Sequence, residues 1–477
     1  MSDPKTEFPI KLGAFLSRTI PGFRELVAYE RLSGGASQET YRLLIRTGAG
    51  ERKLAMRRSP GGHASLRAPG HPGLRTEALL MKSAREAGVP EPEVYGVLEP
   101  EDELGDGFVM EWLEGEALGA RIVRGEQFAL LRPRLAFQCG RILAKIHSID
   151  LDRTGLRELL DPITPDQYID QTWQRYQALE TPQPMIDYTA RWLKAHLPKK
   201  ADMRLVHNDF RNGNFMVSAN TIVAILDWEV AHIGDPMRDL GWICTNSWRF
   251  GSDAPVGGFG EYKDLFDGYE SVSGRRVDAE HVKFWEVFGS FWWAVGCLGM
   301  AEHYRTGPDK TVERPAIGRR SSECQVDCVN LLIPGPVQLI KVKPLDSHLD
   351  MPRTDELVTS VRDFLRSDVM TGTQGRTNFL ARVASNSLDI VLRELALGEE
   401  HRARERSRLR ALFGSSDDLE ALRWRLTHEL RDGTMALDKP GLVEHLRATV
   451  VNQVAIDQPV YSGFRTAAAR ALGRESG

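Results

Sequence analysis

The stretch LVHNDFRNGNFMV at residues 205–217 is followed closely by IVAILDWE at residues 222–229. Both are apolar, β-rich runs with polar residues at their ends, and the short polar joint between them is typical of a hairpin. A hairpin would bring Asn214 and Asp227 side by side at its open end, with Asp209 in the loop just before it. The sequence therefore predicts that three polar side chains meet at one point.

These three residues are the types that phosphoryl transfer needs. Mg²⁺ takes oxygen ligands and shares its remaining sites with phosphates and water, so Asn214 and Asp227 suit it as a pair. A carboxylate that is not a metal ligand, Asp209, would position an acceptor hydroxyl and take its proton. An ordinary hairpin with polar ends is the alternative, and a lone His-x-Asp would favour that alternative. The complete set in this order favours the chemistry.

The spacing resembles the kinase catalytic loop His-x-Asp-x-x-x-x-Asn, here at His207, Asp209 and Asn214. The later Asp227 lies in Leu-Asp-Trp-Glu, and Gly-Asp-Pro-Met-Arg-Asp-Leu follows at residues 234–240. Together these motifs resemble the aminoglycoside phosphotransferase family, the small-molecule branch of the kinase fold. The resemblance implies an α+β, two-lobed protein-kinase-like fold that uses ATP and Mg²⁺ as cofactors.

The resemblance also implies a role for each residue of the loop. Asp209 would be the catalytic carboxylate, and Arg211 matches the position where protein kinases often place a phosphate-binding lysine. Asn214 and Asp227 would hold Mg²⁺. His207 is expected to fix the loop by hydrogen bonding rather than to act as a base.

Upstream, three β-rich runs separated by turns predict the small lobe of such a fold. The runs lie at residues 26–32, 39–46 and 52–57. Gly34, Gly35 and Ser37 lie in the first turn, where backbone N–H groups and a hydroxyl can approach a phosphate. A plain hairpin turn is the alternative reading of these glycines.

Arg57 and Glu77 are expected to position the nucleotide phosphates. Arg57 stands on the third run, where the family usually has lysine, and it keeps the positive charge and can bind a phosphate with two N–H groups. Glu77 lies in the first turns of a helix predicted over residues 74–87 and is its expected partner. A surface arginine is the alternative for Arg57. The backbone at Glu111 and Leu113, between the lobes, would pair with adenine.

Two other polar residues of the large lobe are interpreted as structural. His147 lies in a strongly periodic helix predicted over residues 129–149 and is expected to have a structural rather than a catalytic role. Asp239 is expected to brace the catalytic loop.

The composition excludes several classes of protein. Charge is nearly balanced, with 62 Lys+Arg against 66 Asp+Glu, so no basic excess indicates nucleic acid as a partner. The first residues lack the apolar core of a signal peptide. The most apolar run, residues 284–300, is short for a membrane span and is interpreted as a buried helix. Five scattered cysteines indicate reduced thiols and a cytoplasmic location: Cys139, Cys244, Cys297, Cys324 and Cys328.

The expected acceptor is the hydroxyl of a small molecule. Residues 291–303 and 313–323 resemble a subgroup of these phosphotransferases, the kinase domains fused to acyl-CoA dehydrogenases. That resemblance implies a hydroxyacyl-CoA, whose phosphates Arg314, Arg319 and Arg320 could meet; a solvated basic helix end is the alternative. An aminoglycoside kinase is the second candidate, and a nucleotide-binding pseudokinase scaffold is the candidate of another class.

The chain is expected to contain the following parts: an extension at 1–22, a small lobe at 23–112, a large lobe at 113–336, a linker at 337–352 and a helical domain at 353–477. The last part has apolar residues at helical spacing and predicts five short helices, three of them ended by Gly398, Gly414 and Gly433. It resembles an all-helical domain of unknown function that accompanies these phosphotransferases. A partner enzyme or self-association is expected to engage this small helical bundle.

Overall fold

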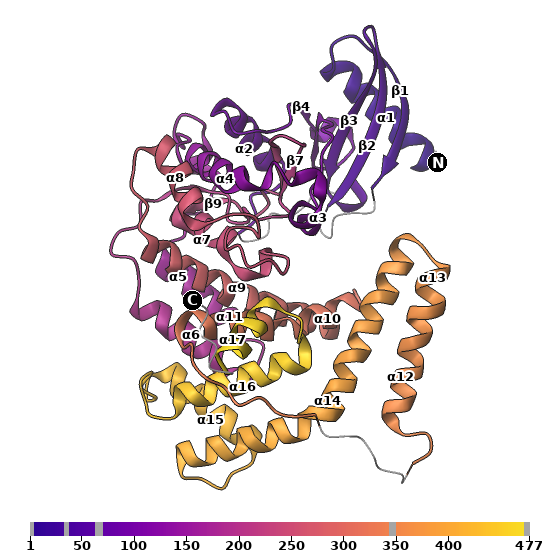
Figure 1. Ribbon diagram of the computed structural model, residues 1–477. Coiled ribbons are helices and arrows are strands. Elements are labelled where there is room, and N and C mark those ends of the chain that lie inside the picture. The colour runs from indigo at the N-terminus through magenta and orange to yellow at the C-terminus, as the bar shows by residue number, and fades with distance from the viewer. Residues whose placement is uncertain (1–3, 33–37, 63–69, 343–349, 472–477) are drawn as a thin grey trace. The chain divides into compact units, whose positions relative to one another are not determined.

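The computed structural model describes residues 4–32, 38–62, 70–342 and 350–471 (Figure 1). The chain forms two compact units that interleave in sequence. The first unit consists of Met1–Pro165, Lys199–Cys244 and Trp248–Trp285. The second unit consists of Asp166–Pro198, Thr245–Ser247 and Glu286–Gly477.

The small lobe of the first unit is an antiparallel sheet of five strands in the order β1-β2-β3-β5-β4. The strands predicted from sequence are confirmed within a few residues. Their bounds, with those of the two helices that accompany them, are α1 Pro4–Thr19, β1 Phe23–Arg31, β2 Glu39–Thr47, β3 Gly50–Arg58, α2 Leu74–Glu86, β4 Val94–Val97 and β5 Gly107–Glu111.

One face of this sheet is covered by α1, where the sequence by itself indicates only a weak helix over residues 10–17. Leu12, Phe15 and Leu16 of the helix share a buried cluster with Leu43 of β2 and Leu54 of β3. The helix therefore forms because its apolar stripe closes the core of the sheet, which its modest local sequence signal did not indicate.

The rest of the first unit is mostly helical, with two short antiparallel pairs of strands, β6–β9 and β7–β8. Its elements, including the two helices α5 and α9 that continue into the second unit, are α3 Gly119–Arg124, α4 Arg132–His147, α5 Pro165–Gln177, β6 Arg204–Val206, β7 Phe215–Val217, β8 Ile222–Ile225, β9 His232–Gly234, α7 Met237–Cys244, α8 Tyr262–Ser273 and α9 Ala279–Thr306.

Two glycines let α4 and α8 approach closely. A Cβ atom on Gly140 of α4 would lie 2.1 Å from the carbonyl oxygen of Leu265, and one on Gly268 of α8 would lie 2.2 Å from that of Phe137. Any larger residue at either position would push the helices apart, because backbone atoms cannot move aside as a side chain can.

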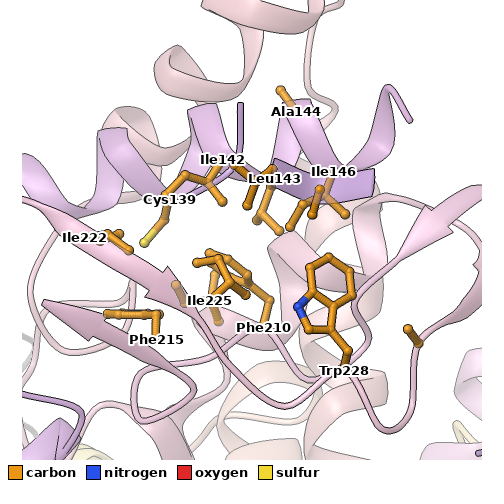
Figure 2. Packing of buried hydrophobic residues seen from close by; sticks show 14 of the residues in the cluster. Cys139, Ile142, Leu143, Ala144, Ile146, Phe210, Phe215, Ile222, Ile225 and Trp228 are labelled. Carbon is orange, nitrogen blue, oxygen red and sulfur yellow. The ribbon is translucent and has the colours of Figure 1, made fainter. Parts of the chain in front are cut away.

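The core under the catalytic loop joins α4 to the β7–β8 hairpin. Figure 2 shows Cys139 and Leu143 of the helix facing Phe215, Ile225 and Trp228. All five side chains are buried. This packing holds the hairpin, and with it the polar residues at its open end, against a rigid helix.

The second unit is built from helices on both sides of the predicted linker. Besides the parts of α5 and α9 that belong to it, its elements are α6 Pro184–Ala195, α10 Glu313–Arg319, α11 Ser321–Leu332, α12 Thr354–Phe364, α13 Met370–Gly372, α14 Gly375–Phe413, α15 Leu419–Asp432, α16 Leu442–Asp457 and α17 Ser462–Ala471. The sequence favours a single helix over residues 316–332, but the structure has two there, α10 and α11. The sequence pattern did not predict α5 or α17.

One apolar core runs through this unit. Met185 of α6 and Val329 of α11 belong to the same buried cluster as Leu426 of α15 and Leu446 of α16. The linker drawn at 337–352 begins inside that cluster, at the buried Val337. The domain boundaries drawn from sequence therefore stay predictions, while the C-terminal helices pack with α6 and α11.

The prediction that a helix ends at Gly398 is wrong. Residues 375–413 form one helix, α14, with Gly398 buried inside it. A glycine inside a helix costs only about 1 kcal/mol relative to alanine. Burial of Leu397 and Leu409 on the two sides of Gly398 offsets that cost. The predicted ends at Gly414 and Gly433 are confirmed, because both residues adopt the left-handed conformation of a C-terminal cap.

The cysteines and much of the most apolar run are buried. All five cysteines are buried free thiols. Within the described residues, no helix combines the length and the apolar character needed to cross a bilayer. The apolar run at 284–300 lies inside α9, where Val287, Phe288 and Phe291 are buried.

Candidate active site

The hairpin predicted around the central motif is confirmed. Phe215 of β7 pairs with Ile225 of β8 in an antiparallel register. Just beyond that pair, the N–H of Leu226 donates to the carbonyl oxygen of Asn214 at 2.8 Å. This bond closes the open end of the hairpin and places Asp227 next to Asn214.

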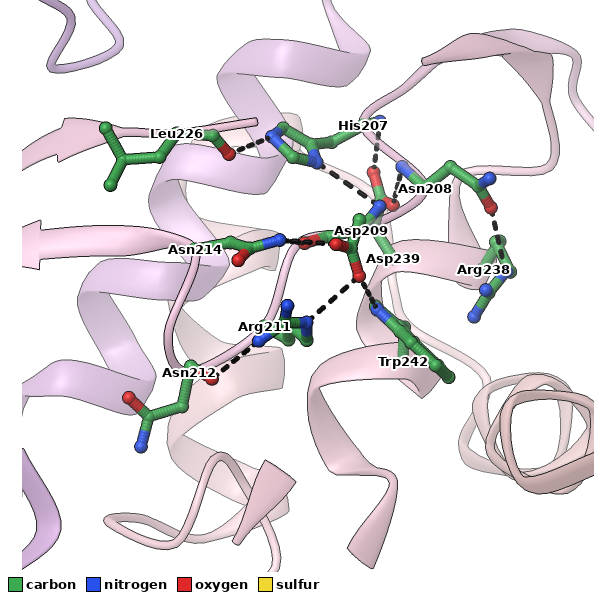
Figure 3. A network of polar contacts seen from close by, with 10 residues as sticks. All are labelled: His207, Asn208, Asp209, Arg211, Asn212, Asn214, Leu226, Arg238, Asp239 and Trp242. Carbon is green, nitrogen blue, oxygen red and sulfur yellow. Dashed lines mark hydrogen bonds and ion pairs between the residues drawn. The ribbon is translucent and has the colours of Figure 1, made fainter. Parts of the chain in front are cut away.

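Asp209 lies in the loop before the hairpin, and three side chains hold its carboxylate (Figure 3). Its Oδ1 accepts hydrogen bonds from the indole Nε1 of Trp242 at 2.7 Å and from Nε of Arg211 at 3.1 Å. Its Oδ2 contacts the amide nitrogen of Asn214, which also donates to the backbone oxygen of Asp209 at 3.0 Å. The carboxylate is therefore fixed in one orientation.

His207 fixes the same loop rather than standing free as a base. Its Nδ1 lies 3.3 Å from the backbone N–H of Asp209, and its Nε2 lies 3.1 Å from the carbonyl oxygen of Leu226. The first contact needs an acceptor and the second a donor, which assigns the proton to Nε2. Burial lowers the pKa of His207, so the ring is neutral and supports both bonds.

Asp239 braces the loop from the other side, as its position in the sequence indicated. Its Oδ2 accepts from the backbone N–H of His207 at 2.8 Å, and its Oδ1 accepts from that of Asn208 at 2.7 Å. The Nε2 of His147 lies 3.0 Å from Oδ2. Burial alone would raise the pKa of Asp239, but the hydrogen bonds from His147 and from the backbone N–H of His207 lower it. The carboxylate is thus charged and fully buried.

Two residues of the site have left-handed backbone conformations. The φ angle is 66° at Asn208 and 72° at Asp227. Asn and Asp tolerate this region better than most residues, because their short polar side chains bond nearby backbone. Asn208 does so through its amide nitrogen, which donates to the oxygen of Val230 at 3.2 Å, while its Oδ1 accepts from Nε of Arg238. Such conformations are concentrated at functional sites, where the surrounding contacts hold them in place.

Arg57 lies between two carboxylates. Its Nη1 is 3.5 Å from Glu77 Oε2, and its Nη2 is 3.3 Å from Asp227 Oδ1. The other oxygen of Glu77 accepts from the amide of Gln38 at 3.1 Å. Burial raises the pKa of Glu77, and the charge of Arg57 opposes that rise. The predicted contact between Arg57 and Glu77 is thus present, and Arg57 also reaches the hairpin residue Asp227.

Sequence reasoning missed two aromatic residues of the site. Trp242 donates to Asp209, and the ring of Trp248 lies under the guanidinium of Arg211, 4.1 Å from its centre. The guanidinium of Arg211 therefore stacks on an aromatic face while it contacts the carboxylate of Asp209. No spacing in the sequence marks either tryptophan, because each reaches the loop through the fold.

The structure describes only some of the predicted nucleotide-binding residues, whereas it describes all of the catalytic loop. The N–H of Glu111 donates to the oxygen of Glu93 at 2.8 Å within the sheet, and Leu113 follows two residues after the end of β5. Gly34, Gly35 and Ser37 lie outside the described residues. The roles given to all seven predicted nucleotide-binding residues, and to those of the catalytic loop, stay predictions.

The sheet-plus-helix lobe and the braced Asp209 loop together define a kinase-like phosphotransferase. The comparison with known families agrees: the model of the phosphotransferase enzyme family (APH) matches residues 28–275. The chain belongs to this family and is a phosphotransferase. A second model, a domain of unknown function (DUF6285), matches residues 371–461. Both resemblances inferred from the sequence are thereby confirmed.

The chain is similar to part of two larger relatives. It is 30% identical to mouse acyl-CoA dehydrogenase family member 10 over 251 residues. The aligned region covers 51% of this chain and 22% of the mouse protein. The chain is 30% identical over 244 residues to chicken acyl-CoA dehydrogenase family member 11, covering 48% of this chain and 30% of that protein. The matched region thus spans less than a third of either relative.

A solved structure supports the fold. An aminoglycoside phosphotransferase structure from Ralstonia eutropha aligns with a TM-score of 0.57 and 23% sequence identity, covering 68% of this chain and 97% of its own. The two-lobed kinase-like fold expected from the motifs is therefore confirmed.

Proposed function

We propose that this phosphotransferase moves the γ-phosphoryl group of ATP to a hydroxyl of a small molecule, with Mg²⁺ as the metal. The braced Asp209 carries the proposal. Its carboxylate is fixed by Trp242, Arg211 and Asn214, and the loop that bears it is held by Asp239. A carboxylate held in this way can accept the proton of a hydroxyl as the phosphoryl group arrives.

The residues at the hairpin end fit a magnesium ion. Both hydrogen bonds of the Asn214 amide use Nδ2, which leaves its carbonyl oxygen as the ligand atom, and Asp227 adds a carboxylate. Among the described residues no group of three or more His, Cys, Asp or Glu side chains could hold a metal. Two protein oxygens suit Mg²⁺, which completes its octahedron with phosphates and water. When bound, it would neutralise charge on the transferring phosphate.

Arg57 supports the nucleotide side of this proposal. It carries a positive charge between Glu77 and Asp227, and its side chain is mostly buried. Glu77 holds the guanidinium in place as one carboxylate partner, so the remaining N–H groups are directed toward Asp227. A phosphate group beside Asp227 would therefore meet a positioned arginine.

A hydroxyacyl-CoA is the proposed acceptor class. The support comes from the relatives, whose names describe acyl-CoA dehydrogenases and whose phosphotransferase-like part is fused to a longer chain. The three arginines expected to meet coenzyme A add little, because each has a carboxylate partner: Arg314 pairs with Asp309, Arg319 with Asp457 and Arg320 with Glu323.

The test is ATP consumption by the full chain with matched acceptors. A hydroxyacyl-CoA should stimulate consumption, and the acyl-CoA of the same length without the hydroxyl should not. Free hydroxy acids and aminoglycosides complete the panel. Stimulation by an aminoglycoside and not by any hydroxyacyl-CoA would contradict the acceptor class while keeping the reaction.

The metal is tested separately with Asp227→Ala, followed by calorimetric titration of Mg·ATP. Removing this carboxylate should abolish the Mg²⁺-dependent part of nucleotide binding. Unchanged affinity would place the metal on other residues.

A further inference from the structure

A cavity of about 570 Å³ lies within the second unit. Its wall includes residues just before and within α6, together with residues of α9, α11, α14, α15 and α16. Asp209, Asn214 and Asp227 belong to the first unit, so this cavity is not the phosphotransfer site. Its volume falls within the ordinary range for small-molecule sites.

A buried ion pair forms one part of the wall. Glu405 of α14 is 1% exposed and accepts a hydrogen bond from Nε of Arg423 of α15 at 2.7 Å, with a second contact from Nη2. Burial alone would raise the pKa of Glu405, but Arg423 lowers it. Both groups are thus charged and satisfy each other.

Other polar atoms around this pair have no hydrogen-bond partner among the described residues. They are Nδ1 of His445, both ring nitrogens of His401 and Nε of Arg408. His445 lines the cavity and is 2% exposed, and His401 is 1% exposed. Arg408 stands behind Thr449 in the wall and donates to its hydroxyl at 3.0 Å. Buried polar groups are nearly always paired, so several unpaired ones in one place indicate a missing partner.

Two of these residues, His401 and Arg408, lie on α14 together with Glu405. His401, Glu405 and Arg408 are spaced four and three residues apart, which places them on one face of that helix. Arg423 and His445 approach the same face from α15 and α16, since the charges of Glu405, Arg408 and Arg423 all act on the His445 ring.

The cluster has one more positive than negative charge. Arg408 and Arg423 are cations and Glu405 is the one carboxylate among these residues, while burial lowers the pKa of His445 to about 4 and also lowers that of His401, leaving both rings neutral. Arg408 is half-buried. A cation that is partly removed from water attracts a counter-ion.

The other charged residues of the wall are balanced by carboxylates. Arg319 lies 2.8 Å from Asp457 and 2.9 Å from Glu394, and Glu394 also contacts Arg402, so two arginines face two carboxylates. Arg305 lies 3.5 Å from Glu302. These pairs cancel, so the net charge around the cavity is the single positive charge of the cluster. This charge favours a ligand with one negative charge.

Another part of the wall is apolar. Met185, Leu446 and Val450 are buried there, and Pro182 and Leu298 add to the surface. A bare inorganic ion would leave this surface in contact with water, whereas an alkyl body would cover it.

We propose that the cavity binds an organic monocarboxylate, with its carboxylate beside His445 and Thr449 and its alkyl body against Met185, Leu446 and Val450. This site does not depend on the proposed phosphotransfer reaction.

The first test is calorimetric titration of the full chain with sodium hexanoate, hexanamide and inorganic phosphate. Hexanoate should bind, and the amide should bind at least about tenfold more weakly, because it lacks the charge. Phosphate should also be weaker, because it lacks the alkyl body. Equal affinity for hexanamide, affinity for phosphate as high as for hexanoate, or no binding of hexanoate would each overturn the proposal.

The second test uses variants. Arg408→Met should weaken hexanoate binding about tenfold or more, while Arg406→Met, an exposed position on the same helix, should leave it unchanged. Equal binding by wild type and Arg408→Met overturns the proposal. Gln453→Trp places an indole in the cavity from a half-buried wall position and tests the location independently of Arg408. It should abolish binding, and retained affinity would overturn the assignment.

Discussion

The catalytic loop of the first unit and the polar cluster of the second unit both bury charged groups, but they complete their hydrogen bonds differently. Asp239, fully buried, receives two backbone N–H groups and lies against His147. In the cluster of the second unit, His401 is equally buried and neither of its ring nitrogens has a partner among the described residues. A complete hydrogen-bond network fixes a reactive group in one position, whereas unpaired buried polar atoms leave a place where a ligand can bind.

The two regions also differ in how their residues are connected along the chain. The loop and hairpin bring Asp209, Asn214 and Asp227 together within a single short stretch of sequence. The cluster draws one or more residues from each of three helices, α14, α15 and α16. The residues of the catalytic loop are close in sequence and can be recognised as a motif. The residues of the cluster are far apart in sequence and form no recognisable motif.

The largest effect is expected at Asp209. Asp209→Asn keeps an acceptor for Trp242 and so keeps the loop, but it removes the carboxylate that would take the proton. Turnover should fall by ~100-fold or more, the usual scale for loss of a general base. Steady-state kinetics with the best acceptor measures this, and Asp267→Asn, on the exposed face of α8, is the control. Near-normal turnover would remove Asp209 from the catalytic role.

Loss of the brace should come next. Asp239→Ala leaves the N–H groups of His207 and Asn208 without acceptors in a buried place. We expect the free energy of unfolding to fall by about 3–5 kcal/mol, as when one partner of a buried charged network is removed. Urea unfolding of the variant and the wild type measures the difference. A loss below about 1 kcal/mol would mean that the loop does not need this carboxylate.

A buried histidine in each unit offers a direct comparison of pH dependence. Burial lowers the pKa of both His232 and His445 to about 4. The ordinary pKa of histidine is about 6.5. Below that pH each of these histidines is protonated in the unfolded chain, but it stays neutral in the folded chain until near pH 4. Each histidine therefore destabilises the protein increasingly as pH falls through that window.

The measurement is the free energy of unfolding of wild type minus that of His232→Gln, followed against pH, with His445→Gln in parallel. The difference for His232 should fall by about 3 kcal/mol between pH 6.5 and pH 4. Subtraction removes the opposite contribution of buried carboxylates such as Glu77. A flat difference would show that His232 can take up a proton in the folded state.

The smallest effect is expected at Arg57. Arg57→Lys keeps a point charge but loses the fork that contacts Glu77 and Asp227, so the KM for ATP should rise less than about tenfold. Arg57→Ala should raise it further. Lys53→Ala, an exposed position on the same strand, is the control. Unchanged kinetics in both Arg57 variants would make Arg57 a structural residue only.

Several expectations from the sequence depended on short-range chain geometry, and the structure confirms them. A hairpin has one register once its turn and apolar residues are set, which brings Asn214 and Asp227 together wherever the hairpin is placed. The alternation of the small-lobe strands and the caps at Gly414 and Gly433 are equally local. Gly398 shows the limit of such reasoning, because the packing of α14 outweighs a local helix stop.

The sequence by itself thus determined the family, the kinase-like fold and the order of the candidate catalytic residues, since these depend on spacing along the chain. Tertiary structure decided which side chains support them. Trp242 reaches Asp209 across thirty-three residues, and Arg57 reaches Asp227 across one hundred and seventy. It also decided that α15 and α16 share a core with α6 and α11. Such contacts depend on which apolar faces pack together. The sequence pattern predicts that an apolar face will be buried, but it does not identify the element that buries it.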